Sequence, residues 1–313
     1  MRKPKIAVIG AGHVGATTAL MLAQKNFGEI VLLDILPGTP QGTALDIVES
    51  APVLRFESRV RGTTAYPDIQ GADIVIISAG SPRHPGMSRM DLLSVNAGVV
   101  ADAARQIAEH APDAIIIAIT NPLDIMCHIV WRSSGFPKNR VIGMAGVLDT
   151  SRFRAFIAEE LNVAVEDIQA MVLGGHGDAM LPFARYATVS GVPIEQFLEP
   201  EAISRLIERT RQGGTEIVNL LKTGSAFYAA AASTTQMVES IVFDSHRFLP
   251  ASVRLDGEFG LSGVFMGVPI ILGRRGVERI VEIKLTDSER TALEQSAEEV
   301  RAGIQAWEDS TRR

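Results

Sequence analysis

The 313-residue chain contains only one cysteine, Cys127. A single thiol excludes a disulfide framework within the chain and a cluster of thiolate metal ligands. So few cysteines are typical of proteins kept in a reducing compartment. We therefore expect a cytoplasmic protein without a metal centre.

The sequence also lacks an unbroken apolar run of the roughly 20 residues needed to cross a bilayer. The basic residues 1–5 lead into an apolar run that stops at Gly10. This pattern predicts a first strand and not a secretion signal, and we expect no membrane association.

An excess of positive charge is missing as well, because 30 Lys and Arg face 36 Asp and Glu, a formal net charge of −6. A nucleic-acid-binding protein would usually show a basic face, so the composition argues against that class. Any anionic ligand would have to be held by locally placed arginines. The hydrophobic content of 46% and the charged content of 21% are ordinary for a globular enzyme long enough for two domains.

The first apolar run, residues 5–10, is typical of a strand buried on both faces. It enters Gly10-Ala-Gly12-His-Val-Gly15, a G-x-G-x-x-G, and a helical pattern follows over residues 16–24. These glycines allow a tight turn, close approach of a pyrophosphate and close helix–strand packing. The phosphates would rest on the helix N-terminus, where backbone N–H groups and the helix dipole favour negative charge.

A second apolar run, residues 29–33, ends in Asp34. This acid follows the glycines by roughly 20 residues, the spacing at which a carboxylate accepts hydrogen bonds from an adenosine ribose. Its charge would repel a 2′-phosphate, which favours NAD over NADP. The alternative is a glycine turn in an unrelated α/β protein, but the strand, turn and helix context favours a cofactor.

Apolar and helical stretches alternate through the first half of the chain. The alternation predicts an α/β fold with a doubly wound parallel sheet of the Rossmann type, whose ligands bind beyond the carboxyl ends of the strands. The further strands are expected at residues 72–79, 114–120 and 140–144, and the helices at residues 91–110, 123–134 and 151–161.

Residues 80–91 follow one of these strands and contain two glycines, two prolines, Arg83 and Arg89. Such a composition predicts a loop, and its two cations suggest a lid that closes on an anion. Taken alone, the segment is more typical of an ordinary solvated surface loop with two arginines, and only the rest of the chain can favour the lid.

Three other polar side chains lie at predicted strand ends or helix starts. Asn121 could bind cofactor or substrate, or form an Asx turn before Pro122. Asp149 could be an ordinary N-cap. Its three-residue spacing from Arg152 also places the two on one face of a helix, where they could orient a base and hold an acid.

The sequence pattern of the second half of the chain predicts an α+β substrate domain. One strand, residues 168–173, runs into Gly174-Gly-His176-Gly-Asp178, whose glycines would present the imidazole closely to a ligand. We place the domains at residues 1–146 and 147–313. The other expected elements are a largely helical region at 200–243 that breaks at 223–225, antiparallel strands at 248–255, 264–272 and 279–283, and a helix at 286–307 with a capping box.

In order and spacing, these motifs resemble the lactate/malate dehydrogenase superfamily over nearly the full chain, and most of all the lactate-dehydrogenase-like malate dehydrogenases of bacteria. The segments that carry the resemblance are Gly10-Ala-Gly12 with Asp34, residues 82–89, Asn121-Pro-Leu-Asp124, residues 143–152 and residues 174–178.

The resemblance implies a role for each matching residue. His176 would take the hydroxyl proton as hydride leaves for the nicotinamide, and Asp149 would fix its tautomer and stabilise its charged form. Arg152 would hold the C1 carboxylate and Arg89 would polarise the C2 oxygen. We also expect Asn96 and Asn121 to contact the cofactor, and Asn121 to contact the substrate.

Arg83 would face the other end of the substrate. Malate-specific relatives carry arginine at this position and lactate-specific ones glutamine, so the resemblance favours a dicarboxylate, malate or oxaloacetate. The alternatives are a lactate or broader 2-hydroxyacid dehydrogenase and, from another class, a catalytically silent NAD-binding sensor or scaffold. Relatives usually form homodimers or homotetramers. Met90, Ala179 and Ala230 depart from residues common in the family without removing a proposed catalytic group.

Overall fold

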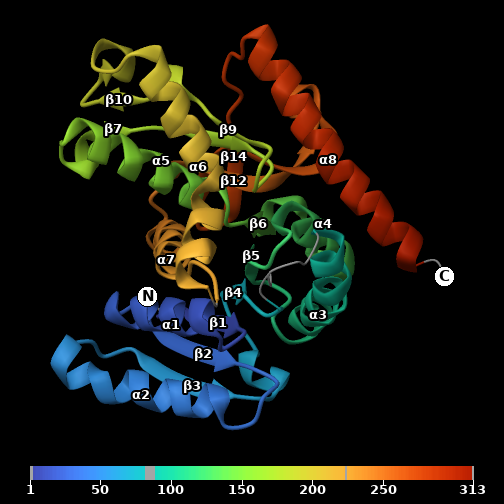
Figure 1. The fold of residues 1–313 in the computed structure, drawn as a ribbon. Helices are drawn as coiled ribbons and strands as arrows, with labels where there is room; N and C mark the ends of the chain where they lie inside the picture. The colour runs from blue at the N-terminus through green and yellow to red at the C-terminus, as the bar shows by residue number, and fades with distance from the viewer. Residues whose placement is uncertain (1–2, 82–88, 223, 312–313) are drawn as a thin grey trace.

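The computed structural model describes residues 3–81, 89–222 and 224–311, with no side-chain description for Arg89, Met90 and Thr311. Its main sheet contains β1 (Lys5–Ile9), β2 (Glu29–Leu33), β3 (Arg59–Thr63), β4 (Ile74–Ile77), β5 (Ile115–Ala118), β6 (Val141–Gly143), β8 (Val172–Gly174), β9 (Met180–Pro182), β12 (Arg247–Asp256), β13 (Ser262–Gly273) and β14 (Gly276–Ile280). These strands follow the order β3-β2-β1-β4-β5-β6-β12-β13-β8-β9, and β14 pairs with β13 (Figure 1).

Strands β1 to β6 are parallel, as the alternation of apolar and helical stretches predicts. All residues of β4 and β5 are buried, because helices cover both faces of this part of the sheet. The helices are α1 (His13–Gln24), α2 (Thr39–Leu54), α3 (Arg89–His110), α4 (Leu123–Ser134), α5 (Gly146–Leu161), α6 (Pro200–Leu221), α7 (Tyr228–Phe243) and α8 (Asp287–Thr311). The predicted Rossmann-type half is confirmed.

Helix α2 and strand β3 were not predicted. Strand β3 lies at the edge of the sheet, where Arg59 is exposed and Val60 is buried. A half-exposed edge strand has no continuous apolar run, which is the pattern that reveals the central strands. Helix α2 contains Pro52, and a proline within a helical pattern weakens the sequence signal for a helix.

The antiparallel strands of the second half extend the parallel sheet. Strand β12 meets β6 through one residue pair, Ser252 with Gly143, and β13 meets β8 through Gly267 with Gly174. The predicted antiparallel pairing of β12, β13 and β14 is confirmed. The boundary between residues 146 and 147 stays a prediction.

The prediction of a single strand at residues 168–173 is wrong, because these residues belong to two strands. Residues Ile168–Gln169 form β7, which pairs with β10 (Thr188–Val189) in a separate small sheet completed by β11 (Val192–Pro193). The chain then enters the main sheet as β8. One apolar run thus serves two sheets, and its composition does not reveal where it changes from one to the other.

The helical region of the second half is confirmed as α6 and α7, which are separated by the segment around the expected break. The predicted capping box of α8 also forms, since Thr286 N donates to Glu289 Oε2 (2.8 Å) and Glu289 N donates to Thr286 Oγ1 (3.2 Å). Within the described ranges, no helix combines the length and apolar character needed to cross a membrane.

The last helix returns to the N-terminal half, where α8 runs beside α4 (Figure 1). His128 of α4 lies in this contact, with its ring near the rings of Trp131 and Trp307. Burial lowers the pKa of His128 to about 4, helped by Arg254 and Arg132 and opposed by Glu308.

This depressed pKa predicts loss of stability in acid. The unfolded chain binds a proton at His128 below about pH 6.5, whereas the folded protein binds it only near pH 4. The stabilisation is therefore complete above pH 6.5 and is lost as the pH falls through about 4. We expect the free energy of unfolding of the wild type to fall by ~1–2 kcal/mol more than that of His128→Phe between pH 7 and pH 4, after allowance for solvent screening. Urea titration at several pH values measures this difference, and parallel curves would contradict it.

Candidate active site

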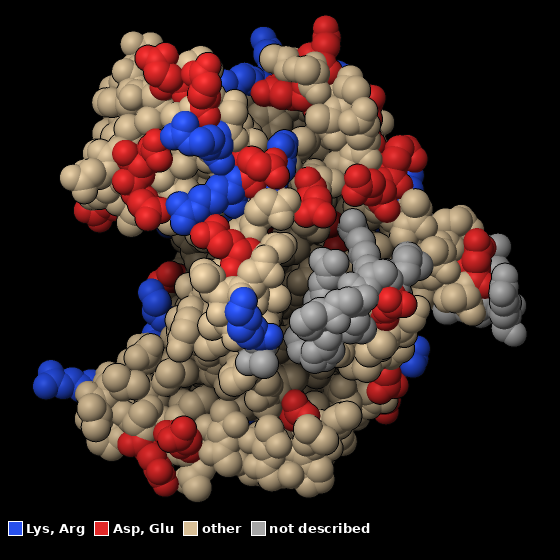
Figure 2. All heavy atoms as spheres, in the orientation of Figure 1, with Lys and Arg blue, Asp and Glu red and all other residues tan. Residues whose placement is uncertain are grey.

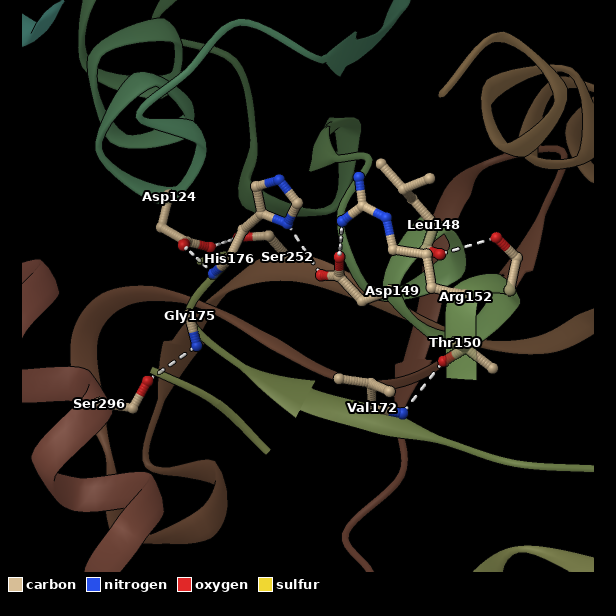
Figure 3. A network of polar contacts seen from close by, with 11 residues as sticks. Asp124, Leu148, Asp149, Thr150, Arg152, Val172, Gly175, His176, Ser252 and Ser296 are labelled. Atoms are coloured by element: carbon tan, nitrogen blue, oxygen red, sulfur yellow. Dashed lines mark hydrogen bonds and ion pairs between the residues drawn. The ribbon is translucent and has the colours of Figure 1, made fainter. Parts of the chain in front are cut away.

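Three side chains predicted to act together do meet in the structure (Figure 3). His176 Nδ1 lies 2.8 Å from Asp149 Oδ2, and Arg152 Nη1 donates to Asp149 Oδ1 at 3.1 Å. The Asp149 side chain is 3% exposed, against 12% for Arg152 and 15% for His176. One buried carboxylate thus contacts a guanidinium with one oxygen and an imidazole with the other.

The helix that carries two of these residues begins earlier than predicted. Helix α5 starts at Gly146 with Ala145 as its N-cap, so Asp149 lies inside the first turn and is not the cap. The prediction that this helix starts at residue 151 is wrong. Residues 146–148 carry no capping signature, so the sequence does not reveal the earlier start. The three-residue spacing still puts Asp149 and Arg152 on one face, as expected. A carboxylate near a helix N-terminus is also stabilised by the helix dipole.

The pKa of His176 is raised above its ordinary value. Burial acts in the opposite direction, but the charge of Asp149 and its hydrogen bond favour the imidazolium, and Asp124 adds to them. Arg152 offsets part of this effect. Since a carboxylate can only accept, Nδ1 carries the proton and Nε2 is the nitrogen that can exchange a proton with a ligand.

Arg152 has unused hydrogen-bonding capacity. Its Nε is buried and has no hydrogen-bond partner among the described residues. Helix α6 packs closely on the arginine, since a Cβ added at Gly213 would lie 3.1 Å from Arg152 Cδ. A guanidinium fixed on one side by Asp149 and on the other by α6 is well placed to bind an anion as a fork.

Surface ion pairs fix α6 against α5. Arg209 pairs with Glu159 (2.7 Å) and Arg205 with Glu160 (3.0 Å). In the upper left of Figure 2, basic and acidic side chains lie close together over this part of the molecule. These pairs are exposed, so each contributes little stability, and the buried side chains of Phe153, Ile157 and Leu206 pack the two helices together beneath them.

The loop that carries His176 is fixed by two backbone hydrogen bonds (Figure 3). Gly175 N donates to Ser296 Oγ of α8 (2.8 Å), and His176 N donates to Asp124 Oδ2 of α4 (2.8 Å). Ser252 Oγ of β12 donates to Asp124 Oδ1 (2.7 Å). Sequence reasoning gave none of these three side chains a role. Asp124 and Ser296 contact the loop from 52 and 121 positions away along the chain, and Ser252 is linked to it only through Asp124.

The glycine motif has the geometry expected of a phosphate-binding turn. Gly10 has φ of +102°, and a Cβ at Gly15 would lie 1.8 Å from the Gly10 carbonyl oxygen. Gly12 differs, because a Cβ built there meets no heavy atom within 4 Å. Gly12 therefore borders open space at the N-terminus of α1, and the first turn of that helix has no acidic residue.

Asp34 holds the glycine motif in place. Its Oδ2 accepts from Ala11 N (2.7 Å) and its Oδ1 from Leu36 N (3.1 Å). Strand β2 thus ends with a carboxylate directly beside the turn. The half-buried Asp34, the open space at Gly12 and the start of α1 together fit the adenosine and pyrophosphate of a dinucleotide.

Asn96 is fully buried and bonded within the protein. Its Oδ1 accepts from Ser81 N (2.7 Å), and its Nδ2 donates to Ser81 O (3.1 Å) and to Asn121 O (2.8 Å). It therefore links Ser81, in the first part of the predicted lid, to Asn121, at the carboxyl end of β5. The cofactor contacts expected for Asn96 and Asn121 stay predictions.

The predicted lid falls largely outside the described residues. Arg83 lies in the segment 82–88 that the structure does not describe, and Arg89 is the first residue of α3. Their proposed contacts with substrate therefore stay predictions. Of the residues that depart from the family pattern, Ala230 is buried in the first turns of α7.

One other cluster contains potential metal ligands. Ligand atoms of Asp244, His246 and Glu278 all lie within 4.8 Å of one another. The His246 Nδ1 is 3.2 Å from Glu278 Oε2, and the His246 side chain is 53% exposed. This geometry fits an ordinary surface ion pair as well as a cation site.

Two protein-family models match successive parts of the chain. Residues 4–143 match the lactate/malate dehydrogenase NAD binding domain, and residues 146–311 match the lactate/malate dehydrogenase alpha/beta C-terminal domain. The chain belongs to the lactate/malate dehydrogenase family. The expected resemblance, the Rossmann-type fold and the NAD cofactor are confirmed.

Individual relatives agree with this family. The malate dehydrogenase of Roseiflexus sp. (strain RS-1) is 51% identical over 304 residues, which cover 97% of this chain and 98% of the relative. The crystal structure of Cryptosporidium parvum malate dehydrogenase superposes with a TM-score of 0.96 at 41% identity, covering 99% of this chain and 100% of that one. The lactate dehydrogenase from the same organism, complexed with lactic acid and β-nicotinamide adenine dinucleotide, gives 0.95 at 41%, with 98% of each chain covered.

The last two comparisons show that the family fold does not choose the substrate. A malate and a lactate dehydrogenase superpose on this chain almost equally well, at the same identity. Specificity must therefore depend on a few side chains at the site.

The hydrogen bonds of Asn96 lead to a stability prediction. Asn96→Ala would remove three part-buried hydrogen bonds and leave a cavity in place of a fully buried side chain, so we expect a loss of ~2–4 kcal/mol of unfolding free energy. Urea unfolding measures this loss. Asn219→Ala, on the exposed surface of α6, is the matched control and should change the value by less than ~0.5 kcal/mol. Equal values for the two variants would show that the buried bonds contribute no stability.

Proposed function

We infer that this chain is an NAD-dependent malate dehydrogenase that interconverts (S)-malate and oxaloacetate. The observation that carries the proposal is the Asp149 carboxylate between His176 and Arg152, which pairs a proton acceptor with an anion-binding guanidinium. Full-length relatives of 51–53% identity that are named malate dehydrogenase support the choice of reaction.

We propose that His176 is the acid–base catalyst. When bound, NAD supplies the hydride acceptor. As the hydride leaves C2 of malate, the hydroxyl proton passes to Nε2 of His176, and the C2–O bond becomes the carbonyl of oxaloacetate. Asp149 stabilises the imidazolium that forms, and it holds the ring in the tautomer whose Nε2 can accept. In the reverse direction the imidazolium returns the proton to the carbonyl oxygen.

Arginines complete the proposed site. Arg152 binds the C1 carboxylate next to the carbon that reacts, using donors that Asp149 leaves available. Arg89 polarises the C2 oxygen, where negative charge develops during carbonyl reduction. Asn121 contributes a further contact to substrate and cofactor.

Substrate choice is assigned to Arg83. A guanidinium facing the methyl group of pyruvate would have no anionic partner, whereas oxaloacetate supplies a second carboxylate. Loss of such a pairing can cost several kcal/mol, a discrimination of about 10⁴. The proposal rests on the sequence of residues 82–89 and on the family resemblance.

On the cofactor side, Gly10, Gly12 and Gly15 would accommodate the pyrophosphate and Asp34 the adenosine ribose. Asp34 favours NAD over NADP because a carboxylate repels a 2′-phosphate. Asn96 contributes here by fixing the backbone at Ser81 and Asn121, and a direct cofactor contact is also proposed. We further propose a cytoplasmic homodimer or homotetramer with domains at residues 1–146 and 147–313.

A second candidate, lactate dehydrogenase, is favoured by the equally good superposition on a lactate dehydrogenase. The two functions are separated by following NADH oxidation with oxaloacetate or pyruvate. We expect kcat/KM for oxaloacetate to exceed that for pyruvate by at least about 10³. Faster turnover of pyruvate would contradict the malate assignment, and no turnover of either substrate would favour a silent NAD-binding protein.

Arg83→Gln is the matched variant for this assay. It should lower kcat/KM for oxaloacetate by at least about 10²-fold and leave that for pyruvate unchanged or higher, because only the dicarboxylate loses an ionic partner. Equal losses for both substrates would remove the selective role of Arg83.

A further inference from the structure

We propose that Asp124 is a positioning residue of the active site, whose buried negative charge acts on His176 together with Asp149 and whose hydrogen bond fixes the backbone that carries the imidazole. The proposal builds on the proposed function, since it concerns the proton that His176 exchanges with the substrate.

The first observation is the bond between the two residues. Asp124 lies in the first turn of α4, in the N-terminal half, and its side chain is completely buried. Its Oδ2 accepts from His176 N at 2.8 Å, across 52 positions of sequence. A buried carboxylate that accepts a backbone N–H bond restrains that backbone strongly, because losing the bond would leave a polar group unsatisfied in the interior.

The second observation is how Asp124 is itself held. Ser252 Oγ donates to Asp124 Oδ1 at 2.7 Å, and Ser252 is the residue of β12 that pairs with Gly143 of β6 (Figure 3). Asp124 is thereby fixed to the line along which the parallel and antiparallel strands meet. The carboxylate thus joins the His176 loop to both halves of the chain.

The third observation is electrostatic. Among the described residues, the charged groups that shift the pKa of His176 are Asp149 and Arg152 from α5 and Asp124 from α4. Asp149 and Arg152 have opposite signs and partly cancel, and the charge of Asp124 adds a smaller contribution toward the imidazolium. The nearby Cys127 thiol stays neutral, because burial and Asp124 raise its pKa.

This arrangement separates two tasks. Asp149 contacts the ring of His176 and selects its tautomer, whereas Asp124 accepts a hydrogen bond from the His176 backbone. Asp124 therefore acts through position and field without touching substrate or cofactor. A distant hydrogen-bonding residue with a merely structural role would change the rate but not the pH at which His176 titrates.

The variant Asp124→Asn removes the negative charge of the side chain and keeps its shape. The asparagine can still accept from His176 N, and it can donate to Ser252 Oγ, whose hydroxyl rotates to accept. Removing one nearby negative charge should lower the pKa of His176. In oxaloacetate reduction, which needs the imidazolium, the alkaline limb of the kcat/KM profile should move down in pH with it. In malate oxidation, which needs the neutral ring, the acidic limb should move in the same direction.

Two variants serve as controls. Ser252→Ala keeps the charge and removes one hydrogen bond, so kcat should fall several-fold while both limbs stay within about 0.2 pH unit. Asp113→Asn removes an exposed carboxylate before β5, at the end of the strand opposite the site, and should leave both rate and profile unchanged because solvent screens it. If Asp124→Asn does not fold, Asp124→Ser removes the same charge and leaves room for water.

NMR titration of the His176 imidazole makes the test independent of activity. The expected result is a lower imidazole pKa in Asp124→Asn than in the wild type and Ser252→Ala. An unchanged imidazole pKa, or a lower rate at every pH with unmoved limbs, would overturn the role of Asp124. Absence of turnover in the wild type would instead refute the malate dehydrogenase assignment, and the NMR comparison would still decide the proposal.

Discussion

The Asp149 carboxylate, held between a guanidinium and an imidazole in the interior, is the constraint on which the site depends. A buried carboxylate is stable only when its oxygens are matched by donors, and here Arg152 and His176 supply them. The same contacts decide the chemistry. They raise the proton affinity of His176, determine which ring nitrogen faces the ligand, and orient a guanidinium toward an anion. Stability and function thus rest on one arrangement.

That arrangement requires the two halves of the chain to meet closely. The parallel and antiparallel strands join through Gly143 and Ser252, where a Cβ on the glycine would lie 2.6 Å from Cys127 Sγ and 2.8 Å from Ser252 Cβ. Only glycine fits this approach without displacing its neighbours. Asp124 and Ser252 lie beside this junction and hold the His176 loop. The acid–base residue is therefore positioned by the place where the halves of the sheet join, and not by its own loop alone.

Much of this could be predicted from local sequence. Continuous apolar runs revealed the central strands, and the glycine motif with Asp34 revealed the cofactor side. The spacing of Asp149 and Arg152 predicted a shared helix face. Sequence reasoning failed where no local signal exists, as at the half-exposed edge strand β3 and at the change of sheet between β7 and β8. Ser252 and Ser296 were missed for a related reason, because their partners lie far away in the sequence.

The most direct test of the account is single-turnover hydride transfer from bound NADH to oxaloacetate in His176→Asn. Asparagine keeps a polar side chain at this position but cannot deliver the proton. We expect NADH to bind with nearly wild-type affinity by fluorescence titration, and hydride transfer to slow by at least about 10³-fold. Transfer within about tenfold of the wild-type rate would contradict the central role of the imidazole that Asp149 holds.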